Sequence, residues 1–237
     1  LFLKTYLRLE DKNSPILANT PTEVFVADDF ENPNAAYNTW RHRYSPNMID
    51  AISNIGTDKL FRKRPKISIL VPVYNPPVEY LKSCIESVRN QVYTNWELCL
   101  ADDLSPNPEV IKVLKSYEDL DNRIKVVYRK TNGHICDASN SALASATGDY
   151  CSLLDHDDLL TPDALFEVVK AINLNESLDF IYSDEDKVND TGEFFEPHFK
   201  PDWSPYSLLC RNYICHFTTI RKNIIDEVGG FRLGFEG

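Results

Sequence analysis

Three aspartates and a histidine stand together in the stretch SLLDHDDLL, where Asp155, His156, Asp157 and Asp158 separate two pairs of apolar residues. Carboxylates packed this closely repel one another and raise their own pKa values unless a cation offsets the charge. Hard oxygen ligands without a cluster of cysteines favour Mg²⁺ or Mn²⁺ over structural zinc. Because Mg²⁺ is usually held by one or two carboxylates together with substrate phosphates, the stretch predicts a cation that links the protein to a diphosphate.

Two more acidic groups follow apolar runs elsewhere in the sequence. Asp102 and Asp103 end the run WELCLADD, and Asp184, Glu185 and Asp186 end the run LDFIYSDED. Ligands of open parallel sheets bind outside the carboxyl ends of the strands, so groups at those ends gather along one edge. For any single group a structural role is the alternative, because aspartates after a strand also cap the next helix or form a turn. Three groups on one predicted edge favour a binding site.

Short strands and helices alternate along the middle of the chain, and they must position these groups. Apolar runs predict strands over residues 66–74, 96–103, 123–129, 149–155 and 178–184. Helical spacing of apolar residues predicts helices over residues 78–91, 107–120, 135–146 and 161–173. Four such alternations with short connections predict an α/β fold with an open, mostly parallel sheet flanked by helices.

The chain divides into two regions of different character. Residues 1–64 hold few apolar runs and are predicted to be an N-terminal extension or linker with helical and irregular parts, whereas residues 65–237 form the α/β domain. Within the domain the regular alternation ends after residue 186. Turn and capping residues predict a hairpin over 187–195, a short helix near 205–211, a strand near 214–221 and a helix closed by Gly229 and Gly230.

The N-terminal region carries two features that could contact the domain. A short amphipathic helix is expected over residues 34–44, where Tyr37, Trp40 and Tyr44 recur about once per turn. These aromatic side chains are expected to dock the segment onto the domain, with a ligand site as the alternative. The basic stretch over residues 61–66 indicates a solvated linker, and contact with a phosphate or an acidic membrane surface is the alternative.

The composition limits the class of protein. A formal net charge of −11 over 237 residues argues against a nucleic-acid partner, which would call for a basic face. The six cysteines form no CxxC pair and are interpreted as buried, reduced thiols of a cytoplasmic protein. The sequence shows no signal peptide and no apolar run of about 18 residues, which a membrane helix would need. Because it opens with Leu1 and stops at Gly237 directly after a predicted element, we expect a fragment of a longer chain.

Several widespread motifs of α/β proteins are absent from the sequence. NPP follows the first predicted strand in place of GxGxxG, and no GxxxxGK[ST] occurs, which argues against dinucleotide-dependent oxidoreductases and P-loop NTPases. No GxSxG occurs either, which argues against an α/β-hydrolase.

Four ordered segments resemble the family 2 glycosyltransferases with a GT-A fold. They are SILVPVYNPPVEYLKSCIESVRNQVYTNWELCLADD, NGHICDASNSALASATGDYCSLLDHDDLL, YSDEDK and EPHFKPDWSP. The subgroup that they resemble most is that of bacterial enzymes of cell-surface polysaccharide synthesis. The resemblance runs from about Lys66 to Gly237, and the YNTW segment also looks like the lead-in found in that subgroup.

The resemblance implies an inverting, metal-dependent hexosyl- or deoxyhexosyltransferase. It would use a UDP or dTDP sugar, with Mn²⁺ or Mg²⁺, and a saccharide or lipid-linked saccharide acceptor. The residues that match the family's nucleotide-binding positions are Pro72, Val73, Tyr74, Asp102, Asp103, Asn132, Gly133 and Asp155. Asp155 and Asp157 match the DxD motif, with Asp157 as the direct metal ligand. His216 lies where related enzymes sometimes supply another ligand, and a buried structural histidine is the alternative there.

The general base is the role that the resemblance leaves most open. In this family the base usually follows the GGF segment, and here GGFRLGFEG ends at Gly237 before such a motif would appear. Asp184, Glu185 and Asp186 match an acceptor-side cluster and are therefore candidates for the base or for acceptor binding.

Two other classes of function compete with this interpretation. A nucleotidyltransferase of similar sheet topology would carry a Gly-rich, basic loop after the first strand, and VPVYNPP has neither property. A non-catalytic module that binds sugar nucleotides would keep nucleotide binding without sugar transfer. Peripheral association with the inner face of the membrane also stays open, because the acceptor could be lipid-linked.

Overall fold

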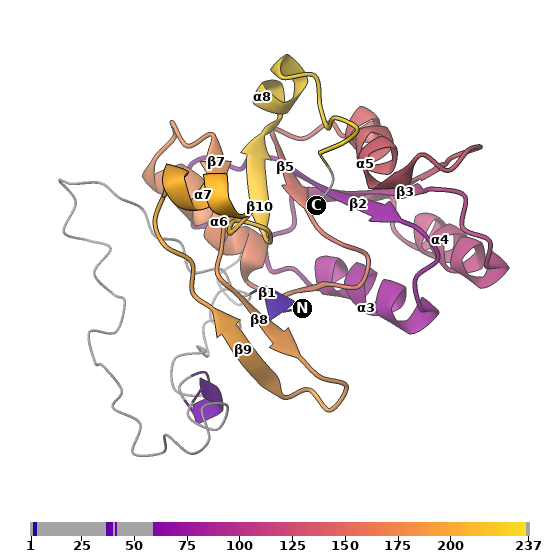
Figure 1. Cartoon of the computed structure of the whole chain (residues 1–237), viewed down its shortest axis with the longest axis horizontal. Helices are drawn as coiled ribbons and strands as arrows, with labels where there is room; N and C mark the ends of the chain where they lie inside the picture. The colour runs from indigo at the N-terminus through magenta and orange to yellow at the C-terminus, as the bar shows by residue number, and fades with distance from the viewer. Residues whose placement is uncertain (1, 4–36, 40, 42–58, 236–237) are drawn as a thin grey trace.

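The central element of the structure is a six-stranded sheet (Figure 1). The computed structural model describes residues 2–3, 37–39, 41 and 59–235. The strand order is β4-β3-β2-β5-β10-β7. The bounds are β2 Ile67–Val73, β3 Trp96–Asp102, β4 Ile124–Tyr128, β5 Tyr150–Leu153, β7 Phe180–Ile181 and β10 Thr218–Arg221. Because β4, β3, β2 and β5 pair in parallel, the predicted mostly parallel α/β sheet is confirmed.

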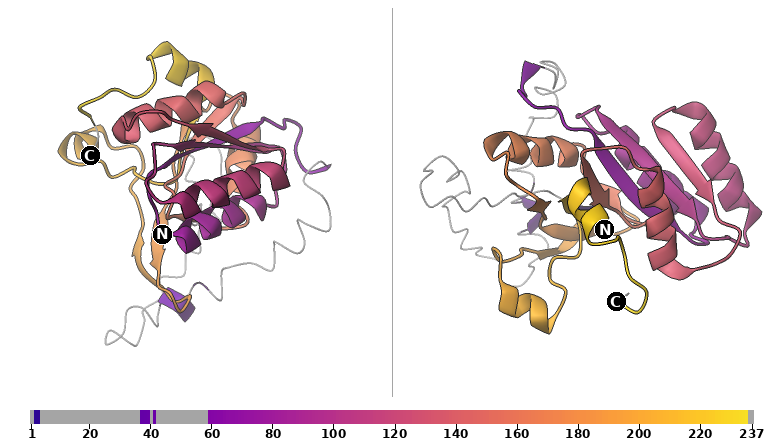
Figure 2. Two further views of the ribbon diagram at one scale, coloured as in Figure 1. Left: turned by 90° about the vertical axis from the view of Figure 1, so that its right-hand side faces the viewer. Right: turned by 90° about the horizontal axis from the view of Figure 1, so that it is seen from above.

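Helices cover both faces of this sheet (Figure 2). One face carries α3 Val78–Arg89, α4 Pro108–Leu120 and α6 Ala164–Leu174, and the other carries α5 His134–Ser145 and α8 Lys222–Glu227. Alternate residues of β2 serve the two faces: Ile69 and Val71 belong to the first core, and Leu70 belongs to the second. A strand that is covered by helices on both faces has an unbroken run of apolar residues, which is why these strands could be predicted from the sequence.

The main departure from the predicted topology concerns the last strands of this sheet. The sequence predicts a strand over residues 178–184, but β7 contains only Phe180–Ile181. Strand β10 lies between β5 and β7 and is antiparallel to both. A buried hydrogen bond joins the hydroxyls of Ser152 and Thr219, 2.7 Å apart and 67 positions apart in the chain. The apolar pattern of a run indicates a strand but does not show which distant strand it pairs with.

A second, smaller sheet has the order β6-β1-β8-β9. Its strands are β6 Leu159–Leu160, β1 Phe2–Leu3, β8 Glu185–Val188 and β9 Phe194–His198. The predicted hairpin is confirmed, because β8 and β9 pair antiparallel and Gly192 in their turn has a φ of +81°. The predicted short helix is α7, Pro205–Cys210. Within the described part of the chain, no helix is long and apolar enough to cross a membrane.

The N-terminal segment contacts this hairpin. Residues 37–39 and 41 are helical, and the rest of the predicted 34–44 helix, including Trp40 and Tyr44, lies outside the described residues. The Tyr37 hydroxyl donates to Asp186 Oδ2 at 2.5 Å, and the Arg41 guanidinium carbon lies 3.1 Å from the centroid of the Phe194 ring. The expected docking of Tyr37 onto the α/β domain is therefore confirmed.

The basic stretch before β2 pairs with carboxylates of the domain. Arg62 and Lys63 both pair with Glu176, and Lys66 pairs with Glu97. These contacts offset part of the positive charge of the stretch within the protein.

The cysteines divide into two groups. Four are buried as predicted, namely Cys84, Cys99, Cys136 and Cys151, whereas Cys210 and Cys215 are exposed. Burial raises the pKa of Cys151 to about 12, so this thiol stays protonated at neutral pH.

Candidate active site

A cavity of about 410 Å³ opens where β2 and β3 end and where the loop after β5 begins. Its volume lies within the range of about 300–1,000 Å³ that is typical of small-molecule sites. The lining residues are Pro72, Val73, Tyr74, Asp103, Asn132, His134, Ile135, Ala138, Asp155, His156 and Asp157. The structure therefore brings together Asp103, Asp155, His156 and Asp157 from the predicted sheet edge.

Asp103 forms one wall of the cavity, and its carboxylate is already held in place. Arg129 Nε donates to Asp103 Oδ1 at 2.7 Å, and the Gly133 backbone N–H donates to both carboxylate oxygens at 3.0 and 3.1 Å. The Asn132 side-chain amide donates to the Asp103 carbonyl at 3.0 Å. These bonds fix two polar side chains, Asp103 and Asn132, at the cavity wall before any ligand binds.

Gly133 supports this wall without lining the cavity. A Cβ atom at this position would lie 2.2 Å from Asp137 Oδ2 and 2.5 Å from Arg129 Nη2, so no other residue fits without displacing them. Arg129 also donates to the Asp137 carbonyl at 2.8 Å and to Ser141 Oγ at 2.5 Å. Arg129 was not among the predicted site residues, although its place at the end of the third predicted strand was an available signal.

The structure does not bring Asp102 into the cavity wall. This side chain is buried, and its carboxylate accepts the Ser105 backbone N–H at 3.3 Å. Asp102 is the last residue of β3, whereas Asp103 follows the strand and lines the cavity. The contact with Ser105 corresponds to the turn-forming role that the sequence left open for Asp102.

The end of β2 and the turn after β5 are joined across the cavity. His156 Nδ1 lies 3.1 Å from the Pro72 carbonyl oxygen, which can only accept, so this hydrogen bond places the imidazole proton on Nδ1. Tyr74 lines the cavity mouth and is 52% exposed, which leaves its ring available to a ligand. His134 and Ile135 also line the cavity and were not predicted; they open α5 directly after the predicted Asn132 and Gly133.

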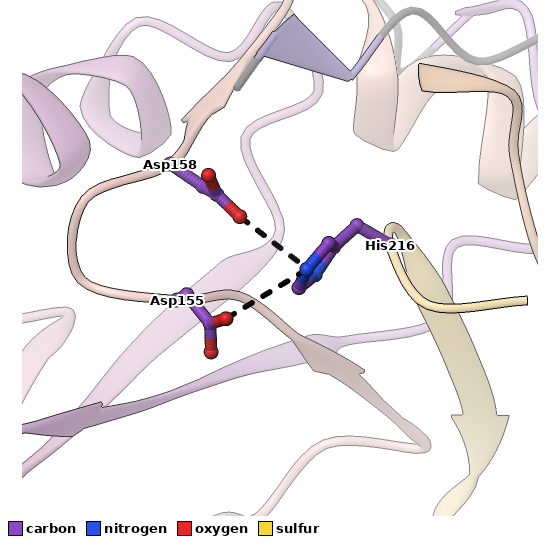
Figure 3. A group of neighbouring side chains, drawn as sticks. All are labelled: Asp155, Asp158 and His216. Atoms are coloured by element: carbon purple, nitrogen blue, oxygen red, sulfur yellow. Dashed lines mark ion pairs between the residues drawn. The ribbon is translucent and has the colours of Figure 1, made fainter. Parts of the chain in front are cut away.

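Asp155, Asp158 and His216 form a second group beside this cavity (Figure 3). His216 Nε2 lies 3.7 Å from Asp155 Oδ2, and His216 Nδ1 lies 3.7 Å from Asp158 Oδ2. One ligand atom of each residue lies within 4.8 Å of the other two. Two carboxylate oxygens and one imidazole nitrogen suit a hard divalent cation such as Mn²⁺, so these residues fit the predicted metal.

The carboxylates of this loop have different environments. Burial raises the pKa of Asp158, the nearby His216 opposes this shift, and Asp155 adds to it. Asp157 is exposed and lines the cavity, but it is not one of the three residues grouped around His216. Asp155 therefore lines the cavity and also belongs to the group around His216. Asp157 lines only the cavity, and Asp158 belongs only to the group around His216.

Cys84 contacts the backbone of the loop that carries Asp155. Its thiol donates to the Asp155 carbonyl at 3.4 Å, and burial together with the neighbouring Asp158, Asp157 and Asp155 carboxylates raises its pKa. A thiol that stays protonated can act as a donor here, so Cys84 helps to fix the backbone that carries Asp155.

The three carboxylates after β7 are each bound by other groups. Asp184 Oδ1 accepts the Lys200 backbone N–H at 2.7 Å, and Glu185 contacts His198 Nδ1 at 3.1 Å and Lys200 Nζ at 3.2 Å. Asp186 is 1% exposed and accepts the hydroxyl of Tyr37. None of the three lines the cavity described above, so their predicted catalytic role stays a prediction.

The model of the family described as glycosyl transferase family 2 matches residues 68–229, more than half of the chain. The chain belongs to this family. The match confirms the resemblance drawn from the sequence, and it covers both the cavity and the group around His216 of this glycosyltransferase.

Two curated relatives are similar to much of this glycosyltransferase. An uncharacterized protein of Sinorhizobium fredii, y4gI, is 53% identical over 173 residues, which are 73% of this chain and 19% of the relative. The O-antigen biosynthesis protein RfbC of Myxococcus xanthus is 36% identical over 203 residues, which are 86% of this chain and 16% of the relative. The chain thus spans less than a fifth of the length of these relatives.

A solved structure supports the fold. The mannosyltransferase PcManGT from Pyrobaculum calidifontis, determined in complex with GDP-Man and Mn²⁺, superposes with a TM-score of 0.55. The two sequences are 17% identical, and the match covers 84% of this chain and 58% of that chain. The predicted GT-A fold is therefore confirmed.

Proposed function

We propose that this glycosyltransferase moves a sugar from a nucleotide-diphosphate sugar to a saccharide or lipid-linked saccharide, with a divalent metal and with inversion of the anomeric carbon. The observation that carries the proposal is the double position of Asp155, which lines the cavity and also belongs to the group around His216. A cation held by a carboxylate shared in this way would lie beside a ligand in the cavity. The O-antigen relative supports a role in cell-surface polysaccharide synthesis.

The donor nucleotide is proposed to occupy the cavity, with its nucleoside at the ends of β2 and β3. The exposed ring of Tyr74 offers a face for stacking on a base, and the fixed Asp103 and Asn132 offer polar contacts for the base or ribose. The diphosphate would then lie toward Asp155 and Asp157. UDP and dTDP sugars are the expected donors, and the GDP-Man bound by the structural relative supports a nucleotide-diphosphate sugar without favouring either base.

The metal is proposed to be Mn²⁺ or Mg²⁺, held by Asp155 and His216 together with Asp157 or Asp158. When bound, such a cation stabilises the negative charge that develops on the departing nucleoside diphosphate. Asp157 remains the ligand implied by the DxD motif, and Asp158 is the ligand favoured by its distance of 3.7 Å from His216. Cys84 and His156 are proposed to position this loop through their bonds to Asp155 and Pro72.

A carboxylate is proposed to deprotonate the acceptor hydroxyl. Among the three predicted candidates, Asp186 is buried and held by Tyr37 and Arg41, so an acceptor would have to displace the N-terminal segment to reach it. Asp184 and Glu185 are partly exposed and are the better candidates within the described part of the chain. We propose a cytoplasmic reaction, at the inner face of the membrane if the acceptor is lipid-linked.

The first test is a melting-temperature panel with UDP, dTDP, GDP and CDP, each with and without Mn²⁺. A ligand that binds only the folded state stabilises it by about 2.7 kcal/mol at a concentration 100 times its Kd. We expect one nucleotide to raise the melting temperature, and only with Mn²⁺. Asp155→Asn should lose this shift, while Asp190→Asn, an exposed substitution in the β8–β9 turn, should keep it. A panel without any Mn²⁺-dependent shift would contradict the proposed donor site.

The stereochemical part needs a separate test. We expect proton NMR of the product formed from an α-linked nucleotide sugar to show a β anomer at the first time point. An α product would exclude inversion but leave the metal and donor assignments untouched. Sedimentation with vesicles that carry a lipid-linked saccharide, compared with vesicles of the same lipids without it, would test association with the membrane acceptor.

A further inference from the structure

Lys200 is the one lysine or arginine in the described residues whose side chain is fully buried, at 1% exposed. It follows β9 and lies outside the cavity described above. Burial lowers the pKa of Lys200, and the Glu185 carboxylate opposes that shift. A buried ammonium group is costly unless it is paired and hydrogen-bonded, so its partners indicate what it does.

The three donors of the ammonium group have three acceptors. Lys200 Nζ donates to the Ile214 carbonyl at 2.6 Å, to the His216 carbonyl, and to Glu185 Oε2 at 3.2 Å. An ammonium group has three N–H bonds, so its donor capacity is filled. Two of these acceptors are main-chain carbonyls on either side of Cys215, and the ammonium group therefore closes the loop that carries His216.

Lys200 is itself fixed at both ends. Its backbone N–H donates to Asp184 Oδ1 at 2.7 Å, and its partner Glu185 is held by His198 Nδ1 at 3.1 Å. Lys200 thus connects the β8–β9 hairpin to the segment that leads into β10. The same segment places the His216 imidazole between Asp155 and Asp158, 3.7 Å from an oxygen of each.

We propose that Lys200 is a positioning residue that fixes the backbone of His216 and thereby aims its imidazole at Asp155 and Asp158. The consequence for metal binding rests on the proposed function, whereas the effect on the loop does not. Groups that orient a metal ligand without touching the metal change metal affinity by about 10- to 100-fold when they are removed. A side chain that only filled space in the core would change stability without this selective loss.

The main test compares Lys200→Met with Lys200→Arg and with the matched control Lys187→Met. Met keeps much of the length and apolar stem but cannot donate, Arg keeps the charge and donors, and Lys187 is an exposed lysine of the same hairpin that pairs with Glu196. The readout is the Mn²⁺ dissociation constant, from the loss of the free Mn²⁺ EPR signal without nucleotide. We expect about 10- to 100-fold weaker binding for Lys200→Met, partial recovery for Lys200→Arg, and no change for Lys187→Met.

A double-substitution cycle tests whether Lys200 acts through His216. His216→Ala should weaken Mn²⁺ binding at least as much as Lys200→Met. Adding Lys200→Met to His216→Ala should cause little further loss, because the ligand that Lys200 positions is already gone. Independent, fully additive losses would overturn the positioning role.

Hydrogen exchange in the metal-free protein separates this inference from the proposed function. Lys200→Met should speed exchange in a peptide that spans residues 212–219, and Lys200→Arg should restore much of the protection. Unchanged exchange in Lys200→Met would overturn the inference, whatever the metal result. If the unsubstituted protein binds no Mn²⁺ while the exchange result holds, the proposed metal site fails and the loop-fixing role stands. If Lys200→Met does not fold, Glu185→Gln carries the exchange test, because it removes the charged partner of Lys200 Nζ, and unchanged exchange in that variant overturns the inference.

Discussion

The two sides of the site are built from different kinds of contact. On the side of β2, β3 and β4, Asp103, Arg129 and Gly133 come from the ends of neighbouring parallel strands and bond directly to one another. On the side of β8, β9 and β10, the His216 carbonyl accepts a hydrogen bond from Lys200 Nζ, and the same ammonium group donates to Glu185. Asp155 lies in the loop after β5, where the two sides meet.

This difference suggests that the two sides have different roles, one in nucleotide binding and the other in metal binding. The first side is held by bonds between residues that follow β3 and β4, and it is the wall proposed to contact the nucleotide. The second side is assembled from the β8–β9 hairpin, the lead-in to β10 and the N-terminal segment. Substitutions in the wall formed by Asp103 and Arg129 should therefore change nucleotide affinity, and substitutions of His216 or of Lys200, which holds its backbone, should change metal affinity. Asp155 should change both.

Asp155→Asn should have the largest effect, because it removes the one carboxylate that both lines the cavity and belongs to the group around His216. We expect the rate of sugar transfer to fall by about 1,000-fold or more, since the charge stabilisation that a metal supplies is worth several kcal/mol. The measurement is a steady-state transfer assay over a range of Mn²⁺ concentrations, with Asp190→Asn as the matched control. A tenfold or smaller loss would mean that Asp155 is not shared between the two sides.

The next largest effects are expected for Asp157→Asn and Asp158→Asn, which should differ in whether nucleotide binding or Mn²⁺ binding is weakened. Asp157 is exposed in the cavity, so Asp157→Asn should weaken Mn²⁺-dependent nucleotide binding by about 100-fold without lowering the melting temperature. Asp158 is buried beside His216, so Asp158→Asn should weaken binding of Mn²⁺ alone and should also lower the melting temperature. Calorimetric titrations with and without nucleotide measure both constants. Unchanged nucleotide affinity in Asp157→Asn would contradict its place in the donor site.

Glu97→Gln tests how firmly the parallel strands of the first side are held. Glu97 is buried, and although burial raises its pKa, hydrogen bonds from Lys125, Lys66 and Ser68 prevail and hold the pKa well below its usual range. The ionised form therefore stabilises the fold above the unfolded pKa of about 4.3, and this contribution is lost as the pH falls toward the folded value.

We expect Glu97→Gln to lower the free energy of unfolding by about 2 kcal/mol at pH 7, as for a buried charged hydrogen-bond group. The difference from the unsubstituted protein should shrink once the pH falls below about 4. Urea unfolding at pH 7 and pH 3 measures both values. An equal difference at the two pH values would show that the ionised carboxylate is not the stabilising species.

Arg129→Met should affect the first side alone. It removes the bonds that Arg129 makes to Asp103 and to Ser141, so the Asp103 carboxylate loses its fixed position. We expect about tenfold weaker nucleotide binding, in line with a lost charged hydrogen bond, and an unchanged Mn²⁺ dissociation constant. Calorimetry with nucleotide and EPR with Mn²⁺ give the two constants. A loss of Mn²⁺ affinity as large as the loss of nucleotide affinity would contradict the division between the sides.

Tyr37→Phe should have the smallest effect. It removes one hydrogen bond to the buried Asp186 and leaves the ring contact of Tyr37 with Phe199 in place. We expect a loss of about 1 kcal/mol in the free energy of unfolding and no change in nucleotide or Mn²⁺ affinity. Urea unfolding and the two binding assays measure this. A large change in either affinity would place the N-terminal segment in the site itself.

The same division explains how much the sequence could predict. The ends of parallel strands meet at one edge, so Asp103, Asn132, Asp155 and Asp157 could be placed together from the alternation of strands and helices alone. Asp102 could not be told from Asp103, because a one-residue difference in where the strand ends decides which side chain faces the cavity. The role of Arg129 could not be predicted, because its partners Asp103, Asp137 and Ser141 come together only in the folded chain.

The second side depends on contacts that a linear pattern does not contain. His216 reaches Asp155 only because β10 inserts antiparallel beside β5. The sequence around Lys200 predicts no regular element. Its side chain is buried only because β9 and the segment that leads into β10 lie side by side in the fold, where Lys200 Nζ donates to the Ile214 carbonyl. The sequence predicts Asp184, Glu185 and Asp186 as one cluster, but Asp184 and Glu185 both bond to Lys200, whereas Asp186 accepts the hydroxyl of Tyr37.

The most direct test of the shared position of Asp155 is a calorimetric titration of the preferred nucleotide with and without Mn²⁺, in the unsubstituted protein and in Asp155→Asn. Because coupling between two ligands is reciprocal, Mn²⁺ should raise nucleotide affinity by the same factor by which the nucleotide raises Mn²⁺ affinity. We predict a factor of about ten or more in the unsubstituted protein, within the usual range of coupling energies, and a factor near one in Asp155→Asn. Equal coupling in the two proteins, or none in the unsubstituted protein, would contradict the assignment of Asp155 as the residue that joins the two sides.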